Sequence, residues 1–178
     1  MLSKELIAKA TRTAETRLQR LWMGFIGAAG SYLLIAFLMS NGKVDSEIIQ
    51  SPKAIPILFV ISMLAIIFAF LFIRRSFDDP SLCRVIGRAS GFTRYDHRTP
   101  DAEMDALLRV MPYIQTRYII AWACLELVAI CGFAVVFFLG RLMVSFSFFG
   151  VAMMGIYMLK PKTEEILDRA QILCQDLL

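Results

Sequence analysis

The sequence predicts an all-α integral membrane protein: a four-helix bundle made of two transmembrane hairpins, with amphipathic helices on its cytoplasmic side. Three observations predict this fold class. Of the 178 residues, 58% are hydrophobic, against about 45–50% in ordinary globular domains. The apolar residues gather into four runs of roughly 20 residues, the length that crosses a hydrocarbon core of about 30 Å. The basic residues lie almost entirely on one side of these runs.

Residues 1–20 are charged and favour a helix. Glu5 and Lys9 stand four residues apart, in the favourable order for an ion pair on a helix face, and apolar residues recur at helical spacing between them and Leu21. We therefore expect a cytoplasmic amphipathic helix at the membrane surface. A cleaved signal peptide is a poor alternative, because the following apolar run is long enough to span and no small-residue cleavage site closes it.

The first transmembrane hairpin is predicted over residues 21–73, with spans at 21–40 and 54–73 and a polar connection between them. Pro56 falls in the first turn of the second span, where a missing backbone N–H is tolerated. A pair of arginines follows the second span.

Small residues recur in the first span at spacings of three and four, namely Gly24, Gly27, Ala28 and Ser31. Such a face lets two helix backbones approach closely in lipid, where close packing drives association. We therefore interpret Gly24, Gly27 and Ala28 as helix-packing residues rather than as a ligand groove.

Residues 74–117 form the largest polar segment and are predicted to be a cytoplasmic helical loop. Asp79-Pro80 indicates the start of one helix, and Thr99-Pro100 indicates the start of another. Pro112 is expected to kink the second helix as it enters the third span. The loop is too small to hold an enzyme domain of its own.

The second transmembrane hairpin is predicted with spans at 118–140 and 142–159, joined by an almost absent connection. Gly150 and Gly155 are interpreted as the helix-packing residues of the fourth span. Residues 160–178 are expected to form a cytoplasmic amphipathic tail helix, since acidic residues follow its threonine start and apolar residues recur at helical spacing.

The positions of the basic residues predict the topology. Sixteen of the 19 Lys and Arg residues lie in the N-terminal arm, the large loop and the tail. Because cytoplasmic segments carry an excess of Lys and Arg, both termini and the large loop are expected in the cytoplasm. We therefore expect a multi-pass protein of the cell inner (cytoplasmic) membrane.

Glu126 is the only Asp, Glu, Lys, Arg or His residue within any predicted span. It lies nine residues beyond Arg117, roughly 13 Å into the third span by helical rise. Placing a charge there is costly, so the neutral acid is the favoured form. Ser31 and Tyr32 stand at a similar depth on the first span and are candidate hydrogen-bond partners.

Two interpretations of Glu126 stay open at this point, with a cofactor or lipid contact as a third. It is either a protonated acid that holds neighbouring helices or a partner subunit, or a proton or cation relay site. Relays usually show several polar groups along a path. The spans offer few, which favours the structural interpretation.

Other chemistry is sparse. The four cysteines show no metal-ligand spacing, and His97 is the only histidine, which excludes bis-histidine haem ligation within this chain. Acidic residues near His97, namely Asp101, Glu103 and Asp105, are explained by the positive N-terminal end of a helix. We expect no metal and no cofactor.

The loop arginines suit anionic headgroups rather than nucleic acid, and no nucleotide-binding or hydrolase motif occurs.

The sequence therefore predicts a non-enzymatic membrane protein, a small structural or accessory subunit of a larger membrane protein complex. Its expected partners are the lipid bilayer and other membrane protein subunits, or a second copy of itself. The alternative is a proton- or cation-coupled transporter or channel protomer in which Glu126 lines a shared path. A membrane enzyme ranks third, because no acid–base pair is present.

Overall fold

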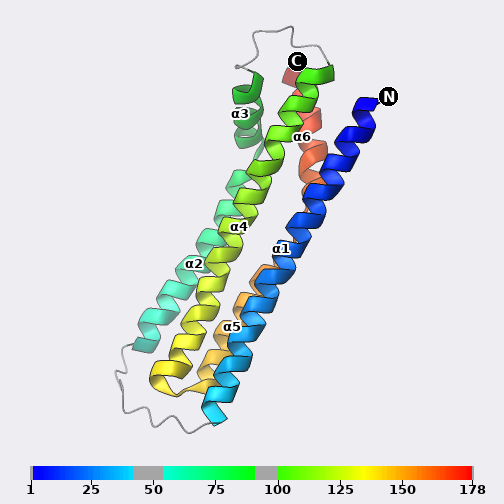
Figure 1. The fold of residues 1–178 in the computed structure, drawn as a ribbon. Coiled ribbons are helices and arrows are strands. Elements are labelled where there is room, and N and C mark those ends of the chain that lie inside the picture. Colours follow the sequence, from blue (N-terminus) through cyan, green and yellow to red (C-terminus); the bar gives the residue numbers. More distant parts are fainter. Residues whose placement is uncertain (1, 42–53, 91–99, 178) are drawn as a thin grey trace. The chain divides into compact units, whose positions relative to one another are not determined.

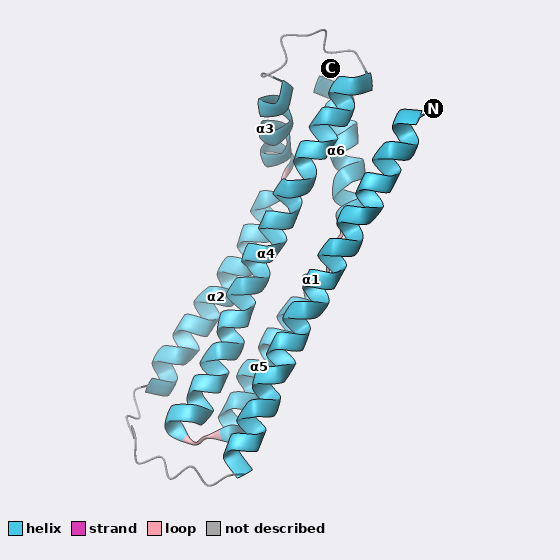
Figure 2. Ribbon diagram, in the orientation of Figure 1, coloured by secondary structure: helices cyan, strands magenta, loops and turns pink. Residues whose placement is uncertain are grey.

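The computed structural model describes residues 2–41, 54–90 and 100–177, and every regular element in those ranges is an α-helix (Figures 1 and 2). Along the chain the helices are α1 (Leu2–Asn41), α2 (Ala54–Ser76), α3 (Asp79–Ser90), α4 (Pro100–Leu139), α5 (Leu142–Met158) and α6 (Thr163–Leu177). The predicted all-α class is thus confirmed for the described part of the chain.

Among the described residues, three helices are long and apolar enough to cross a membrane, over Arg12–Met39, Ile55–Ser76 and Val110–Leu139. Helix α5 has 17 residues, so it rises only about 25 Å, short of a hydrocarbon core of about 30 Å. A fourth span results if α5 and the start of α6 are counted as one interrupted span. By length and composition, the described part of the chain therefore has three helices that can each cross a membrane, or four on that count, as in a multi-pass helical membrane protein.

Two helices continue through positions where the sequence suggested a change of environment. Helix α1 runs unbroken from the charged N-terminal residues into the first span. Helix α4 does the same and passes through Pro112, although a proline removes one helical hydrogen bond. The hydroxyl of Thr116 donates to the carbonyl of Pro112 at 2.8 Å. The predicted membrane edges near residues 20 and 117 therefore fall inside continuous helices.

The chain divides into two compact units. Unit 1 comprises Met1–Arg20, Phe72–Ile119 and Pro161–Leu178, and unit 2 comprises Leu21–Leu71 and Ile120–Lys160. In unit 1, α3 packs on α6. Unit 2 contains most of the residues of the predicted spans.

The core of unit 2 is built mainly by α4. Its fully buried apolar residues there are Ala121, Trp122, Leu125, Val128, Ala129 and Val135. Helix α2 contributes much less, because in unit 2 its buried residues, Ser62 and Ala69, lie seven residues apart on one narrow face. Helix α4 is therefore the central helix of this unit.

The turn between α4 and α5 depends on Gly140. Its φ is 61°, in the left-handed region that disfavours side chains, and its N–H donates to the carbonyl of Val136 at 3.0 Å. This is the αL form of helix C-cap. The predicted two-residue connection is thus a tight turn with a specific glycine requirement.

We expect Gly140→Ala to lower the free energy of unfolding by about 1–2 kcal/mol, the cost of a left-handed residue with a Cβ. Unfolding in mixed detergent micelles measures it. Gly150→Ala is the matched control, because Gly150 is exposed and an added Cβ there meets no atom within 4 Å. Equal stability of the two variants would contradict the prediction.

Part of the predicted polar region lies outside the described residues. This applies to the connection over residues 42–53, to His97, and to the side chains of Asp101, Glu103, Asp105 and Cys174.

Candidate functional site

Helices α1 and α4 bring two of the polar residues singled out in the sequence together within unit 2. The hydroxyl of Tyr32 donates a hydrogen bond to Oε1 of Glu126 at 3.4 Å. Both side chains are partly buried. The bond is long for an O–H···O contact, whose usual range is about 2.5–3.0 Å, so it is a weak contact.

The ring of Tyr32 is positioned by an aromatic neighbour on α4. It lies 6.2 Å from the ring of Phe133, centroid to centroid, at an interplanar angle of 47°. Phe133 is seven residues after Glu126, which places both on the same side of α4 two turns apart. Tyr32 therefore contacts α4 through its ring as well as through its hydroxyl.

Ser31 does not join this pair. Its side chain is exposed, and its hydroxyl donates to the carbonyl of Gly27 in its own helix at 2.9 Å. Successive residues of a helix are about 100° apart around its axis. Since Tyr32 faces α4, Ser31 points elsewhere.

The small residues of the first span are not on the face that α1 uses within unit 2. An added Cβ at Gly24 or Gly27 would meet no described atom within 4 Å, and Ala28 is half-buried. Helix α1 packs instead through residues at alternating spacings of three and four: Trp22, Phe25, Ala29, Tyr32 and Ala36. The packing role of Gly24, Gly27 and Ala28 stays a prediction. A helix that packs against this face would have to come from outside the described residues.

Of the two glycines expected to pack in the fourth span, only Gly155 is in close contact. A Cβ added to it would lie 2.9 Å from Cδ2 of Leu125, whereas one added to Gly150 would meet nothing within 4 Å. A glycine that was not singled out, Gly132 of α4, makes the closer approach. Its added Cβ would lie 2.7 Å from Cβ of Phe148 and 3.3 Å from the carbonyl oxygen of Ser145. A glycine inside a helix costs about 1 kcal/mol relative to alanine. A glycine in the middle of a predicted span was therefore the sequence signal that could have identified Gly132.

The two tryptophans of the chain meet the C-terminal end of α5. The indole N–H of Trp22 donates to the carbonyl of Ile156 at 2.8 Å, and that of Trp122 donates to the carbonyl of Leu159 at 3.0 Å. The last carbonyls of a helix lack partners within it, and the N–H of Lys160, four residues after Ile156, donates to the carbonyl of Tyr157 instead. We call this arrangement the tryptophan cap of α5.

Aromatic and cationic neighbours surround the tryptophan cap. Tyr157 lies 6.3 Å from the ring of Trp22, Phe25 lies 5.7 Å from that of Trp122, and the Lys160 ammonium is 5.9 Å from the Trp22 ring. Both tryptophans stand within a few residues of the predicted start of a span. That position is typical of the aromatic belts of membrane proteins, a signal that could have identified them from the sequence.

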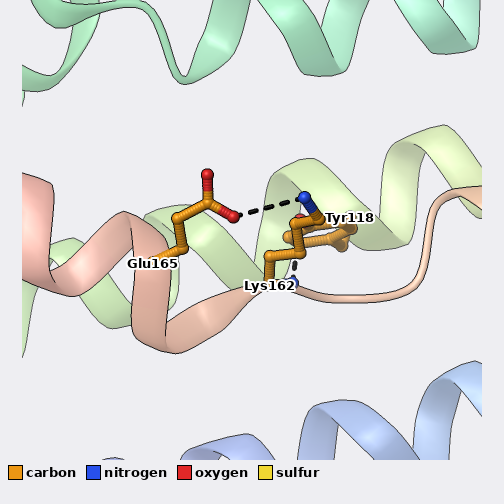
Figure 3. A network of polar contacts seen from close by, with 3 residues as sticks. All are labelled: Tyr118, Lys162 and Glu165. Atoms are coloured by element: carbon orange, nitrogen blue, oxygen red, sulfur yellow. Dashed lines mark hydrogen bonds and ion pairs between the residues drawn. The ribbon is translucent and has the colours of Figure 1, made fainter.

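Unit 1 contains a separate polar network at the start of α6 (Figure 3). The backbone N–H of Lys162 donates to the hydroxyl of Tyr118 at 3.2 Å. The ammonium of Lys162 pairs with Glu165 at 3.3 Å, with side chains 71% and 60% exposed. So exposed an ion pair stabilises little, and the backbone contact does more to fix the start of α6.

No model of a protein family, no curated protein and no solved structure matches the chain.

In the described part, no group of three or more His, Cys, Asp or Glu side chains could hold a metal ion. The chemistry of the candidate site is therefore that of one carboxylic acid beside one phenol. Such a pair can link α1 to α4, or it can hold and pass a proton.

Proposed function

We propose that the chain is a non-enzymatic structural or accessory subunit of a larger protein complex in the inner (cytoplasmic) membrane, with both termini in the cytoplasm. The observation that supports this most is the outward face of α1. Gly24, Gly27 and Gly30 lie there with room for a Cβ at each.

Three glycines on this face have a cost with no packing gain among the described residues of the chain. Each glycine in a helix interior destabilises it by about 1 kcal/mol relative to alanine, and a lipid-facing position needs no close backbone approach. Packing of another helix against this face would offset the cost, because small residues let helix backbones approach in a bilayer. The proposal places a helix of another chain there.

The exposed side chains of α2 do not distinguish a partner from lipid. Ile57, Phe59 and Val60 are all more than half exposed. Acyl chains cover leucine-like and aromatic side chains as well as a protein does. The glycine face of α1 is therefore the more informative surface.

Substitution of Gly27 by leucine tests the proposed subunit role. We expect Gly27→Leu to weaken association with the co-purifying membrane protein about tenfold, the effect of roughly 1.4 kcal/mol, because the added side chain separates the helix backbones. Purification in mild detergent with quantitative identification of stoichiometric partners measures it.

Val60→Leu is the matched control for Gly27→Leu, because it adds bulk at an exposed position of α2 that is already apolar. It is expected to leave association unchanged. A Gly27→Leu variant that retains its partner at wild-type stoichiometry, or a wild-type protein that purifies alone, would refute the proposed role.

The second candidate function is that of a proton- or cation-coupled transporter or channel protomer. The specific observation in its favour is the Tyr32–Glu126 pair, two proton-carrying groups in contact within the spans. It needs a path of further polar groups, and none is evident among the neighbours of Glu126 described above. We therefore place it second.

Glu126→Gln separates the two candidates. If Glu126 only links helices, the glutamine keeps an oxygen that accepts the bond from Tyr32, and we expect stability to change by less than about 1 kcal/mol. Proton flux into proteoliposomes, followed with a pH-sensitive dye, should stay at the level of empty liposomes for both proteins. Wild-type flux that disappears in Glu126→Gln and survives Ser31→Ala would establish the second candidate instead.

A further inference from the structure

Arg117 of unit 1 has an unusual setting for a basic residue of a membrane helix. It lies in the interior of α4 and is the last Lys or Arg before the apolar run that ends at Leu139. Its side chain is half-buried. The arginines at the end of α2, Arg74 and Arg75, are exposed and are explained by the negative C-terminal end of their helix. That explanation does not apply to Arg117.

Two aromatic rings enclose the guanidinium of Arg117. Its Cζ lies 4.9 Å from the centroid of the Phe72 ring and 4.7 Å from that of the Tyr113 ring. Guanidinium groups stack on aromatic faces and are weakly hydrated. Contacts of this kind orient the group and leave the N–H donors at its edge available.

The ring of Tyr113 is itself fixed. Its hydroxyl donates to the carbonyl of the buried Ser76 at 3.0 Å, and the ring of Phe77 meets it edge-on at 6.4 Å and 86°. The Tyr113 ring, which covers one side of the Arg117 guanidinium, is therefore held to the end of α2. A guanidinium positioned in this way loses little further freedom when it binds an anion.

Within the described residues, Arg117 makes no hydrogen bond or ion pair. The positions one turn away on α4 carry Tyr113, Ile114, Ile120 and Ala121, so no acidic residue is available at helical spacing. Lys162, by contrast, pairs with Glu165. A half-buried cation without an anion is unfavourable, which makes an external anion the natural partner.

We propose that Arg117, clamped between Phe72 and Tyr113, binds the phosphate group of an anionic lipid at the edge of the membrane. The planar fork of arginine matches two phosphate oxygens at once. The site rests on the chain spanning a membrane and is independent of the proposed subunit role.

Lipid binding by the purified full-length protein tests the site. Titration with phosphatidylglycerol and with phosphatidylcholine, read by native mass spectrometry, should show one lipid held about tenfold more tightly when it is anionic, the effect expected of charge-assisted hydrogen bonds. Arg117→Gln should abolish most of this preference. Arg74→Gln is the matched control and should weaken binding less than about twofold, as expected for an exposed charge.

Three results would overturn the proposal. The first is an unchanged lipid preference in Arg117→Gln, and the second is an equal loss in Arg74→Gln, which would indicate diffuse attraction. The third is displacement of the lipid by millimolar inorganic phosphate, which would indicate a site for soluble anions.

If circular dichroism shows that Arg117→Gln does not fold, Phe72→Leu tests the site instead, because it keeps the charge and removes one ring. It should weaken binding several-fold, and unchanged affinity would refute the site.

Discussion

Replacing Trp122 by alanine should lower the free energy of unfolding by about 3–5 kcal/mol, the range for truncating a large buried aromatic side chain. Trp122 is fully buried. Its ring contacts that of Phe25 on α1, and its indole N–H caps α5 through Leu159. The substitution therefore removes packing between helices and a hydrogen bond to a helix end at once. Unfolding of the detergent-solubilised protein with increasing sodium dodecyl sulfate measures it.

Two milder variants divide this effect into its parts. Trp122→Phe keeps most of the buried ring but leaves the carbonyl of Leu159 without its indole donor, which should cost about 1–3 kcal/mol. Trp22→Phe does the same to the carbonyl of Ile156 and should cost less, because Trp22 is only half-buried. If Trp122→Phe is as stable as wild type, the tryptophan cap contributes nothing and the packing alone matters.

Substitution of Gly132 by valine is expected to destabilise the α4–α5 hairpin by about 1–3 kcal/mol or more, the cost of overpacking a closely packed core. Even a Cβ at this position would lie 2.7 Å from Cβ of Phe148. That atom is next to the backbone of α5 and cannot rotate away, so the two helices have to separate. Gly132→Ala should show a smaller loss of the same sign.

The matched control for Gly132 is Gly150→Ala on the partner helix. Gly150 is exposed, and an added Cβ there meets nothing within 4 Å. Its replacement should be neutral or stabilising by up to about 1 kcal/mol, because alanine favours helix over glycine. Both variants are compared by the same unfolding measurement. Equal stability of Gly132→Ala and Gly150→Ala would show that α4 and α5 do not approach at Gly132.

The candidate site was partly predictable from the sequence. Glu126 stands out because one acidic residue in a long apolar run is unusual, and Tyr32 could be paired with it from helical rise alone, since both lie at a similar depth. Depth along a helix does not say which way a side chain points. Ser31, one residue before Tyr32, satisfies the same depth criterion and bonds to its own helix instead.

The glycines illustrate the same limit. Small residues at helical spacing mark a face on which helices can approach, and Gly155 does lie against Leu125. The pattern does not identify which helix covers the face, or whether it belongs to the same chain. Gly132 is the only glycine of α4 and has one small residue at helical spacing, Ala129, so the sequence could suggest a close approach but not its partner, Phe148.

The sequence by itself determined that this protein is helical, where its span-length apolar segments lie along the chain, and that one carboxylic acid is placed within one of them. These properties follow from segment length, composition and the cost of placing each residue in hydrocarbon, all of which are local. The tertiary structure alone decided which face of α1 packs, that Gly132 and Gly155 bring α4 and α5 together, and that two tryptophans cap α5. Those outcomes depend on the rotation of each helix about its axis, which is set by the side chains of its neighbours. For Glu126 the structure defines a hydrogen-bond partner, Tyr32, where the sequence left Ser31, Tyr32 or a group on another chain open.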